Sequence, residues 1–302
     1  MEKKYSPFFS VVIPTYNCAD FLDRALKSVF DQTYPNYEII VIDNSSTDHT
    51  RNILDKYSNE RLKVYRLNNN GNIALSRNKG ITYAKGKWIA FLDSDDTWYS
   101  KKLETVFNEI ENSPDAILFC HNENHVVGNK IKKSLSYGPG GKKINEYLLF
   151  NGNCLSTSAV CIKTTIAKKT NGFSERSDFI TAEDYEYWIR LSNYGNFSFI
   201  KQILGEWHTH NNNYSGNPKT HANATIAVLE FHLINRQENH KDISRKISKA
   251  RSRAYSNGAR MFQVSKMFED ATRYAFQALK YNPINIKAFF IIILSLLKIN
   301  KP

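Results

Sequence analysis

Residues 88–96 read Trp-Ile-Ala-Phe-Leu-Asp-Ser-Asp-Asp, an apolar run that ends in three carboxylates. Five consecutive apolar residues are typical of a strand buried on both faces. Similar strand patterns occur at residues 10–14, 38–43 and 63–67, and helical patterns separate them at residues 21–30, 47–57 and 73–84. Strands that alternate with helices of this length predict an α/β protein with a doubly wound, mostly parallel sheet.

Polar clusters follow three of these strands, at residues 15–17, 43–48 and 93–96. Ligands of such sheets bind beyond the carboxyl ends of the strands. Mg²⁺-type sites use one or two carboxylates together with substrate phosphates, which favours a metal–diphosphate site at Asp93 and Asp95. An N-cap of a helix is the alternative reading of these aspartates. Repulsion among three neighbouring carboxylates favours a bound cation.

Further candidates occur later in the chain, and each has a structural alternative. Glu183 and Asp184 lie in the first turn of a helix predicted at residues 182–193, where acidic residues also suit the helix dipole. Either could act as a general base. His208 and His210 fall on one side of a predicted strand and either complete a metal site or line a surface. Arg77 is a phosphate partner or a solvated helix residue.

The second half of the chain has a mixed pattern. We expect a helix at residues 102–111, a strand at residues 116–120, and short separate strands at residues 196–200 and 204–208. Residues 128–143 are rich in Gly and Lys, which predicts an exposed flexible loop. From about residue 221 the pattern is helical throughout.

The charge of the chain is concentrated near its end. The 302 residues carry 41 Lys and Arg against 29 Asp and Glu, a formal net charge of +12. Residues 1–224 hold 27 basic and 24 acidic residues, whereas residues 225–302 hold 14 and 5. The excess therefore belongs to the helical tail, which points to an anionic partner surface. The four cysteines form no CxxC pair and no signal-peptide pattern is present, so we expect a reduced, cytoplasmic compartment.

The tail contains a basic amphipathic pattern and a short apolar segment. Residues 241–256 place Ile243, Ile247, Ala250 and Ala254 on one helical stripe among Lys and Arg residues. This pattern predicts peripheral contact with an anionic membrane through residues 241–299, at the cytoplasmic face of the inner membrane. A helix packed on the catalytic domain is the alternative. The apolar run at residues 288–297 is too short to span a bilayer, which needs about 20 residues.

Six motifs, taken together and in their order along the chain, resemble those of the family 2 glycosyltransferases. They lie at residues 10–17, 38–50, 71–96, 171–175, 183–191 and 207–215. The resemblance covers roughly residues 8–216. It implies the GT-A fold, a Rossmann-like sheet flanked by helices, with a C-terminal helical appendage. The implied domains are a catalytic domain at residues 1–220, with a donor half at about 8–100 and an acceptor half at about 101–220, and a basic helical region at residues 221–302.

The resemblance also implies residue roles. Donor-nucleotide contacts are expected from Pro14, Tyr16, Asn17, Asp43, Arg77, Asp93 and Ser94. Asp95 and His210 are expected to hold a divalent cation, Mn²⁺ or Mg²⁺. Asp184 matches the catalytic base, with Glu183 beside it at the acceptor edge.

This sequence departs from the family pattern at three points. Asp43-Asn44-Ser45 stands where Asp-Asp-Gly is frequent, and His208 stands where Arg is expected. Residues 202–207 read Gln-Ile-Leu-Gly-Glu-Trp and lack the Gln-x-x-Arg-Trp motif of processive synthases. We therefore expect a non-processive enzyme.

The expected function is an inverting transfer of a hexose or N-acetylhexosamine from a nucleotide-diphosphate sugar, most often a UDP-sugar. The acceptor is expected to be a hydroxyl of a glycan or a lipid-linked molecule in surface polysaccharide, lipopolysaccharide or glycoconjugate synthesis. A nucleotidyltransferase could use the same metal–carboxylate site. A basic nucleic-acid-binding protein is the other alternative, but no nucleic-acid-binding motif occurs in the sequence, so we expect no nucleic-acid partner.

Overall fold

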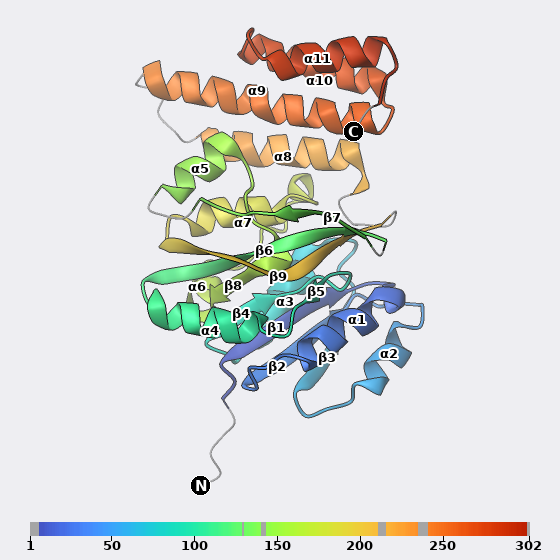
Figure 1. Ribbon diagram of the computed structural model, residues 1–302, viewed down its shortest axis with the longest axis vertical. Helices are drawn as coiled ribbons and strands as arrows, with labels where there is room; N and C mark the ends of the chain where they lie inside the picture. Colours follow the sequence, from blue (N-terminus) through green and yellow to red (C-terminus); the bar gives the residue numbers. More distant parts are fainter. Residues whose placement is uncertain (1–5, 129, 140–142, 211–215, 235–240, 301–302) are drawn as a thin grey trace. The chain divides into compact units, whose positions relative to one another are not determined.

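The computed structural model describes residues 6–128, 130–139, 143–210, 216–234 and 241–300, and the chain divides into two compact units (Figure 1). The first unit comprises Met1–Ile144, Cys154–Phe173 and Arg190–His210. The second comprises Asn145–Asn153, Ser174–Ile189 and Asn211–Pro302. Most of α5 (Ile144–Asn151) and α7 (Glu183–Leu191) thus group with the C-terminal helices, whereas we expected a single boundary near residue 220.

The first unit contains the predicted parallel array, with the order β3-β2-β1-β4. Its strands are β1 (Phe9–Thr15), β2 (Tyr37–Asp43), β3 (Leu62–Arg66) and β4 (Trp88–Phe91). Every residue of β1 and β2 is buried, which explains their continuous apolar sequences. Thr15 lies opposite Asp43 in the register, so the polar residues after β1 and β2 meet at one edge of the sheet.

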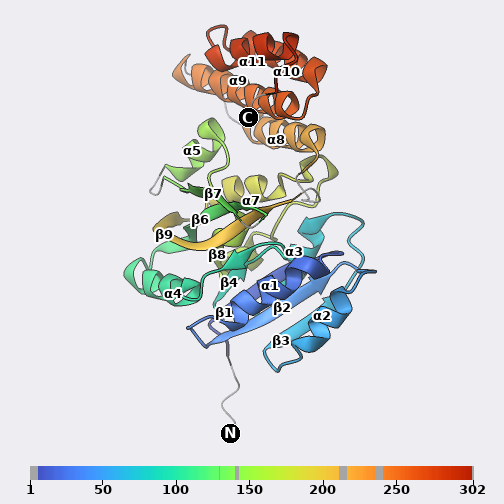
Figure 2. The ribbon, with the colours of Figure 1, turned by 45° about the vertical axis from the view of Figure 1, so that its right-hand side comes forward.

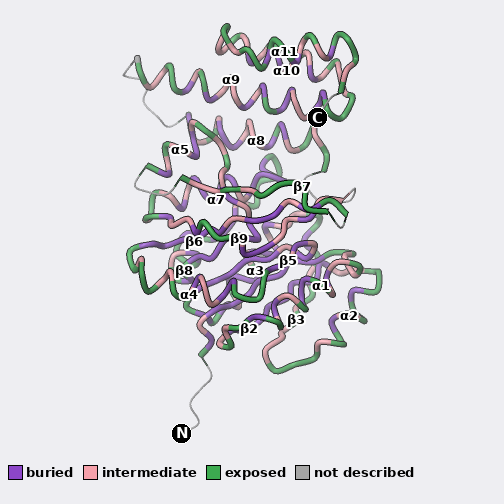
Figure 3. The backbone as a smooth tube through the Cα atoms, in the orientation of Figure 1, coloured by how far each residue is buried: buried purple, intermediate pink, exposed green. Residues whose placement is uncertain are grey.

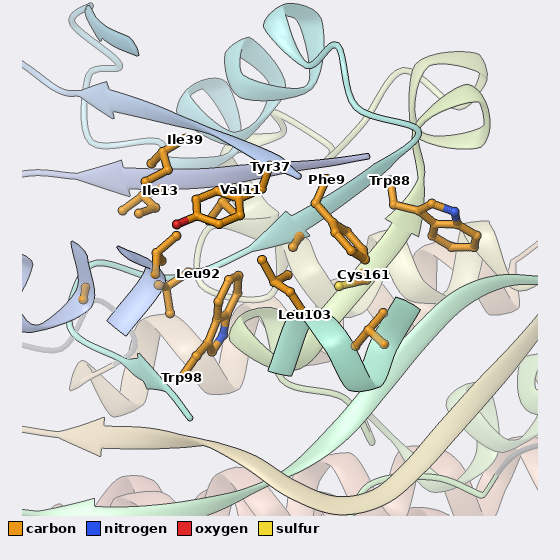
Figure 4. Packing of buried hydrophobic residues seen from close by; sticks show 14 of the residues in the cluster. Phe9, Val11, Ile13, Tyr37, Ile39, Trp88, Leu92, Trp98, Leu103 and Cys161 are labelled. Carbon is orange, nitrogen blue, oxygen red and sulfur yellow. The ribbon is translucent and has the colours of Figure 1, made fainter. Parts of the chain in front are cut away.

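Helices cover both faces of this array. Phe9, Val11 and Ile13 of β1 pack with the buried side of α1 (Ala19–Phe30) and with α2 (Thr50–Lys56) in one core cluster (Figure 2 and Figure 4). Val12 points to the other face, where it contacts α3 (Ile73–Tyr83). A Cβ at Gly80 of α3 would come within 2.3 Å of the Val12 side chain, so a glycine permits this close approach.

Beyond β4 the sheet becomes mixed. The order continues through β8 (Val160–Lys163), β6 (Ala116–Val127), β9 (Asn196–Thr209) and β5 (Thr97–Trp98), and β7 (Lys130–Leu135) pairs with β6. β8 is antiparallel to both of its neighbours, β4 and β6, whereas β6 and β9 are parallel to each other. The helices α4 (Lys102–Asn112) and α6 (Thr164–Lys169) complete the unit.

Two expectations about this half are corrected. The separate strands expected at residues 196–200 and 204–208 form the single strand β9, whose register against β6 shifts at irregular positions. The loop expected at residues 128–143 contains the strand β7, whose lysines project from an exposed edge position. Charged, exposed residues of this kind suit the edge of a sheet. Residues 129 and 140–142 of that segment lie outside the described residues.

The described residues after 217 form four helices of the second unit, in agreement with the helical pattern predicted there: α8 (Pro218–Leu233), α9 (Lys241–Val264), α10 (Phe268–Tyr281) and α11 (Ile286–Leu296). The apolar stripe of α9 is covered by protein (Figure 3). Its residues Ile247, Ala250 and Ala254 are buried against Leu229 and Leu233 of α8. The stripe of α9 is thus packed within the helical region itself, on α8, instead of facing lipid or the catalytic domain. Within the described residues, no helix combines the length and apolar content that crossing a membrane requires.

A buried carboxylate ties the start of the sheet together. Glu38 is 2% exposed and accepts hydrogen bonds from the Ser10 hydroxyl and the Lys85 amide, both at 2.8 Å. The Lys63 ammonium donates to its second oxygen at 3.0 Å. The Ser10 hydroxyl in turn accepts from the Gly86 amide at 2.8 Å. The Glu38 carboxylate thus accepts hydrogen bonds from β1, from β3 and from the turn before β4.

Replacing Glu38 with Leu is expected to lower the free energy of unfolding by about 2 to 4 kcal/mol, because buried donors lose their acceptor. Chemical denaturation at neutral pH measures this change. Glu104→Leu is the matched control, since Glu104 accepts a hydroxyl hydrogen bond from Thr33 at an exposed site. The control should change stability by no more than about 0.5 kcal/mol. Equal losses in the two variants would contradict the assigned role of Glu38.

Candidate active site

The three carboxylates after β4 leave the strand toward different partners. Leu92 still donates its amide to the Val12 carbonyl at 3.1 Å, and the turn closes with the Asp96 amide on the Asp93 carbonyl at 3.1 Å. Asp93 and Asp95 are partly exposed, whereas Asp96 is 3% exposed. Exposure thus alternates along residues 93–96, so that Asp93 and Asp95 are accessible to a ligand and Asp96 is not.

Asp93 is paired with the arginine that sequence analysis singled out. The Arg77 guanidinium on α3 donates to Asp93 Oδ1 at 2.8 Å. The Arg77 side chain is 5% exposed and its guanidinium carbon lies 5.3 Å from the centre of the Phe173 ring. The amide of Asp93 donates to the Ser158 hydroxyl at 3.1 Å. Asp93 is therefore held in place from both its side chain and its backbone.

Asp95 lies beside the predicted metal-binding histidine. His210 Nε2 is 3.1 Å from Asp95 Oδ2, and the imidazole stacks on Phe21 of α1 with ring centroids 4.3 Å apart. Burial raises the pKa of Asp95, and the charge of Asp93 adds to this effect, while His210 opposes it. A site that disfavours a lone negative charge is one in which a cation would be stabilised.

The residues present fit a divalent cation of the Mn²⁺ or Mg²⁺ type. Asp95 offers a carboxylate oxygen and His210 an imidazole nitrogen, and these two atoms lie 3.1 Å apart. Across the described residues, three or more His, Cys, Asp or Glu side chains do not gather around a common metal position. Coordination by Asp95 and His210 would thus be completed by donor phosphates and water, which is how Mg²⁺ sites are usually built.

Asp96 has a structural role that sequence analysis left open. It accepts the backbone amide of His208 at 2.9 Å and the hydroxyl of Ser158 at 2.5 Å. Burial and the neighbouring carboxylates raise its pKa well above the usual range. Because Asp96 binds the backbone of β9, it fastens that strand to the turn that carries Asp93 and Asp95.

The two histidines of β9 have different partners. His208 Nε2 is 3.1 Å from Glu206 Oε2 and 3.4 Å from the Thr97 hydroxyl. Burial lowers the pKa of His208, with Glu206 acting in the opposite direction. His210, two residues further along, reaches Asp95. The structure thus brings only His210 to the carboxylates as a candidate ligand; Ser215, which helped to locate it in the sequence, lies outside the described residues.

The loops after β1 and β2 are joined by hydrogen bonds. Asn17, in a left-handed conformation with φ of 45°, accepts the Thr47 amide through its side chain at 2.8 Å. Its own amide donates to the Ser46 hydroxyl at 3.0 Å. Asp43 accepts the Ser46 amide at 2.9 Å. Asn17 and Asp43, both predicted donor-site residues, therefore belong to one preformed edge.

The remaining predicted donor residues at this edge differ in exposure. Pro14 is buried at the end of β1, whereas Tyr16 is 58% exposed and presents its ring to solvent. Ser94 is buried and hydrogen-bonds Cys18, whose thiol pKa burial raises to about 11. Cys18 thus stays protonated and contributes packing and a weak hydrogen bond.

Three residues of this region were not predicted as site residues from the sequence. Ser158 joins Asp93 to Asp96, Phe21 supports His210, and Phe173 lies under Arg77. Each lies far in sequence from the residue that it supports. Phe173 falls in the motif at residues 171–175, but its contact with Arg77, like the contacts of Ser158 and Phe21, depends on the fold and not on a local pattern.

The proposed catalytic carboxylates belong to the second unit. Asp184, in the first turn of α7, accepts the Tyr185 amide at 2.6 Å and the Asn153 side-chain amide at 3.2 Å. Glu183 is 4% exposed, so Asp184 is the more accessible of the two. The hydroxyl of Tyr185 donates to the Leu148 carbonyl at 2.7 Å and joins α7 to α5.

The different environments of Asp95 and Asp96 predict opposite effects of mutation on stability. Asp95→Asn removes a carboxyl group whose pKa is raised by folding, so that its charged form destabilises the folded protein at pH 7. The Tm of the cation-free variant at pH 7 is therefore expected to rise. Asp96→Ala leaves the His208 amide and Ser158 hydroxyl without their acceptor and is expected to cost about 2 to 4 kcal/mol. Thermal and chemical unfolding measure both. A loss of stability in Asp95→Asn as large as that in Asp96→Ala would contradict this division.

Comparison with known proteins identifies relatives across the chain. Residues 10–169 match Glycosyl transferase family 2. TuaG of Bacillus subtilis (strain 168), a glycosyltransferase assigned to teichuronic acid biosynthesis, is 30% identical over 216 residues, which cover 70% of this chain and 83% of TuaG. WfaP of Escherichia coli, a UDP-Glc:alpha-D-GlcNAc-diphosphoundecaprenol beta-1,3-glucosyltransferase, is 30% identical over 186 residues, covering 62% and 70%.

Solved structures agree in fold. TarS 1–349 of S. aureus in complex with UDP-GlcNAc gives a TM-score of 0.69 at 19% identity and covers 96% of this chain and 87% of that chain. The mannosyltransferase PcManGT from Pyrobaculum calidifontis, in complex with GDP-Man and Mn²⁺, gives 0.61 at 14% identity, with 97% and 81% covered. At these identities the likeness shows the fold, and it confirms the expected GT-A architecture. The sequence match carries the relationship, and the chain belongs to Glycosyl transferase family 2.

Proposed function

We propose that this chain is an inverting glycosyltransferase that moves a hexose or N-acetylhexosamine from a UDP-sugar to a hydroxyl of a glycan or a lipid-linked acceptor. The proposal depends on one observation, the pairing of the two accessible carboxylates after β4. Arg77 donates to Asp93, and His210 lies within hydrogen-bond distance of Asp95. Family membership supports glycosyl transfer over the nucleotidyltransferase alternative. WfaP, with its UDP-Glc donor and lipid-linked acceptor, supports the substrate classes.

The donor edge would bind the nucleotide and its diphosphate. Exposed Tyr16 offers a ring for stacking on the base, and Asp43 offers a carboxylate for the base or ribose. Arg77 holds Asp93 in a fixed orientation. A divalent cation bound by Asp95 and His210 would neutralise the charge that develops on the departing diphosphate.

Asp184 is proposed as the general base. As the acceptor oxygen attacks the anomeric carbon, Asp184 would take its proton, while the bond from that carbon to the diphosphate oxygen breaks on the opposite face. One displacement inverts the anomeric configuration. Hydrogen bonds from Asn153 and the Tyr185 amide keep the Asp184 carboxylate oriented.

Asp184→Asn is expected to lower kcat for sugar transfer by about 100-fold or more, because the base is lost while the shape is kept. The donor KM should stay within about twofold. Nucleotide released from a UDP-sugar in the presence of acceptor and Mn²⁺ measures the rate. Asp178→Asn is the control, since Asp178 pairs with Arg176 at an exposed position of the same unit. Full transfer by Asp184→Asn would remove the base assignment, and release of pyrophosphate in place of UDP would favour a nucleotidyltransferase.

A lipid-linked acceptor would be reached most readily by an enzyme held at the membrane. α11 and the residue that follows it present an exposed apolar face, formed by Ile286, Phe289, Phe290, Ile293, Leu296 and Leu297. The stripe of α9 is packed inside the unit, so within the expected region 241–299 we assign the contact to α11. The excess of basic residues after residue 224 matches an anionic lipid surface.

The double substitution Phe289→Glu and Phe290→Glu is expected to weaken binding to vesicles containing anionic phospholipid by at least about tenfold, since two aromatic side chains can no longer insert. Cosedimentation at two salt concentrations measures the partition. The control is Ile131→Glu, because Ile131 is 58% exposed on β7 and outside this face. Equal partition of the wild type and the double variant would argue against membrane contact through α11.

A further inference from the structure

The turn before α7 has an unfavourable backbone conformation. Thr181 has φ of 78°, a left-handed value at which a β-branched residue is strained. Ala182 follows and α7 begins at Glu183, so Thr181 sets the direction from which the helix starts. Strained residues of this kind persist only where their surroundings hold them, and they concentrate at functional sites.

A histidine from α8 holds this residue. His221 Nδ1 lies 2.9 Å from the Thr181 carbonyl oxygen and 3.2 Å from its hydroxyl. A carbonyl oxygen can only accept, so Nδ1 is the donor. Burial lowers the pKa of His221, with the Thr181 carbonyl and Glu183 acting in the opposite direction.

The position of His221 is itself fixed. Asn217 caps α8 by accepting the amides of Lys219 and Thr220 at 3.0 and 3.1 Å. The amide of His221 donates to the Asn217 carbonyl at 3.1 Å. His221 therefore projects from a well-formed first turn, and later residues of α8 are anchored in a buried cluster with α9.

The residues before Thr181 are also attached to α8. The Ala182 amide donates to the Phe179 carbonyl at 2.8 Å, which closes the turn around Thr181. Phe179 is buried and packs edge-on against Phe231 of α8 at 5.5 Å between ring centroids. Two contacts from one helix thus hold the turn, one at Thr181 itself and one at Phe179.

We propose that His221 is a positioning residue for catalysis, which keeps Thr181 in its strained conformation so that α7 begins with Asp184 correctly oriented. This inference rests on the proposed role of Asp184 as the base. Without the His221 donor, Thr181 would relax toward a negative φ and the first turn of α7 would rotate. The 3.2 Å hydrogen bond between Asn153 and Asp184 would then be lost.

Three variants test this role. His221→Leu keeps the volume of the side chain but removes the donor, and should lower kcat about 10- to 100-fold with the donor KM within about twofold. His221→Asn places an amide donor near the position of Nδ1 and should retain most of the activity. Thr181→Gly combined with His221→Leu should restore kcat to within about threefold of the wild type, because glycine adopts a positive φ without strain.

A control and a second readout separate positioning from folding. Thr272→Val removes a hydroxyl that donates to the Phe268 carbonyl within α10, and should leave kcat within about twofold. The amide of Glu186 makes the first hydrogen bond of α7, to the Ala182 carbonyl at 3.1 Å. Hydrogen exchange of peptides covering this amide should become faster in His221→Leu and return in the double variant.

The outcomes distinguish this inference from the proposed function. Unchanged kcat and unchanged exchange in His221→Leu would overturn the positioning role, as would a failure of Thr181→Gly to restore either. If Asp184→Asn abolishes transfer in the same assay, the proposed function stands regardless. If Asp184→Asn stays active, the base assignment fails, and the exchange rate of Glu186 alone then decides whether His221 holds the turn.

Discussion

Three carboxylates within four residues at the end of a buried strand repel one another, and the arrangement of the first unit follows from how they are separated. Arg77 neutralises Asp93, and His210 meets Asp95. Asp96 is turned into the protein, where a backbone amide and a hydroxyl bind it. Two of the carboxyl groups remain accessible to a ligand, whereas the third, Asp96, binds β9.

The buried carboxylate also determines where His210, the histidine predicted to bind a metal, lies. Asp96 binds the amide of His208 on β9, and His210 follows two residues later on the same strand. β9 is held close at this point because Gly205 approaches the turn, where a Cβ would come within 2.8 Å of the Thr97 carbonyl. Residues more than a hundred positions apart in sequence thus meet through one structural carboxylate.

The sequence was sufficient to predict the parts of the fold that local patterns encode. Unbroken apolar runs identified β1, β2 and β4, and the polar residues after them lie at one edge of the sheet. β9 was predicted as two strands because exposed Lys201 and Gln202 interrupt its apolar pattern, and only its pairing with β6 makes it continuous. The stripe of α9 could equally face lipid or protein, and its packing on α8 decides this. Ser158 and His221 act across long sequence separations and leave no local signal.

The central claim is that Asp95 and His210 together bind a divalent cation at the donor diphosphate. Pulsed electron paramagnetic resonance of Mn²⁺ bound to the protein with UDP tests it most directly, because a coordinating imidazole couples its nitrogen to the metal. The wild type is expected to show this nitrogen coupling, His210→Phe to lose it, and Asp95→Asn to lose most of the bound Mn²⁺. A wild-type complex with no nitrogen coupling, or equal Mn²⁺ binding by Asp95→Asn, would contradict the account.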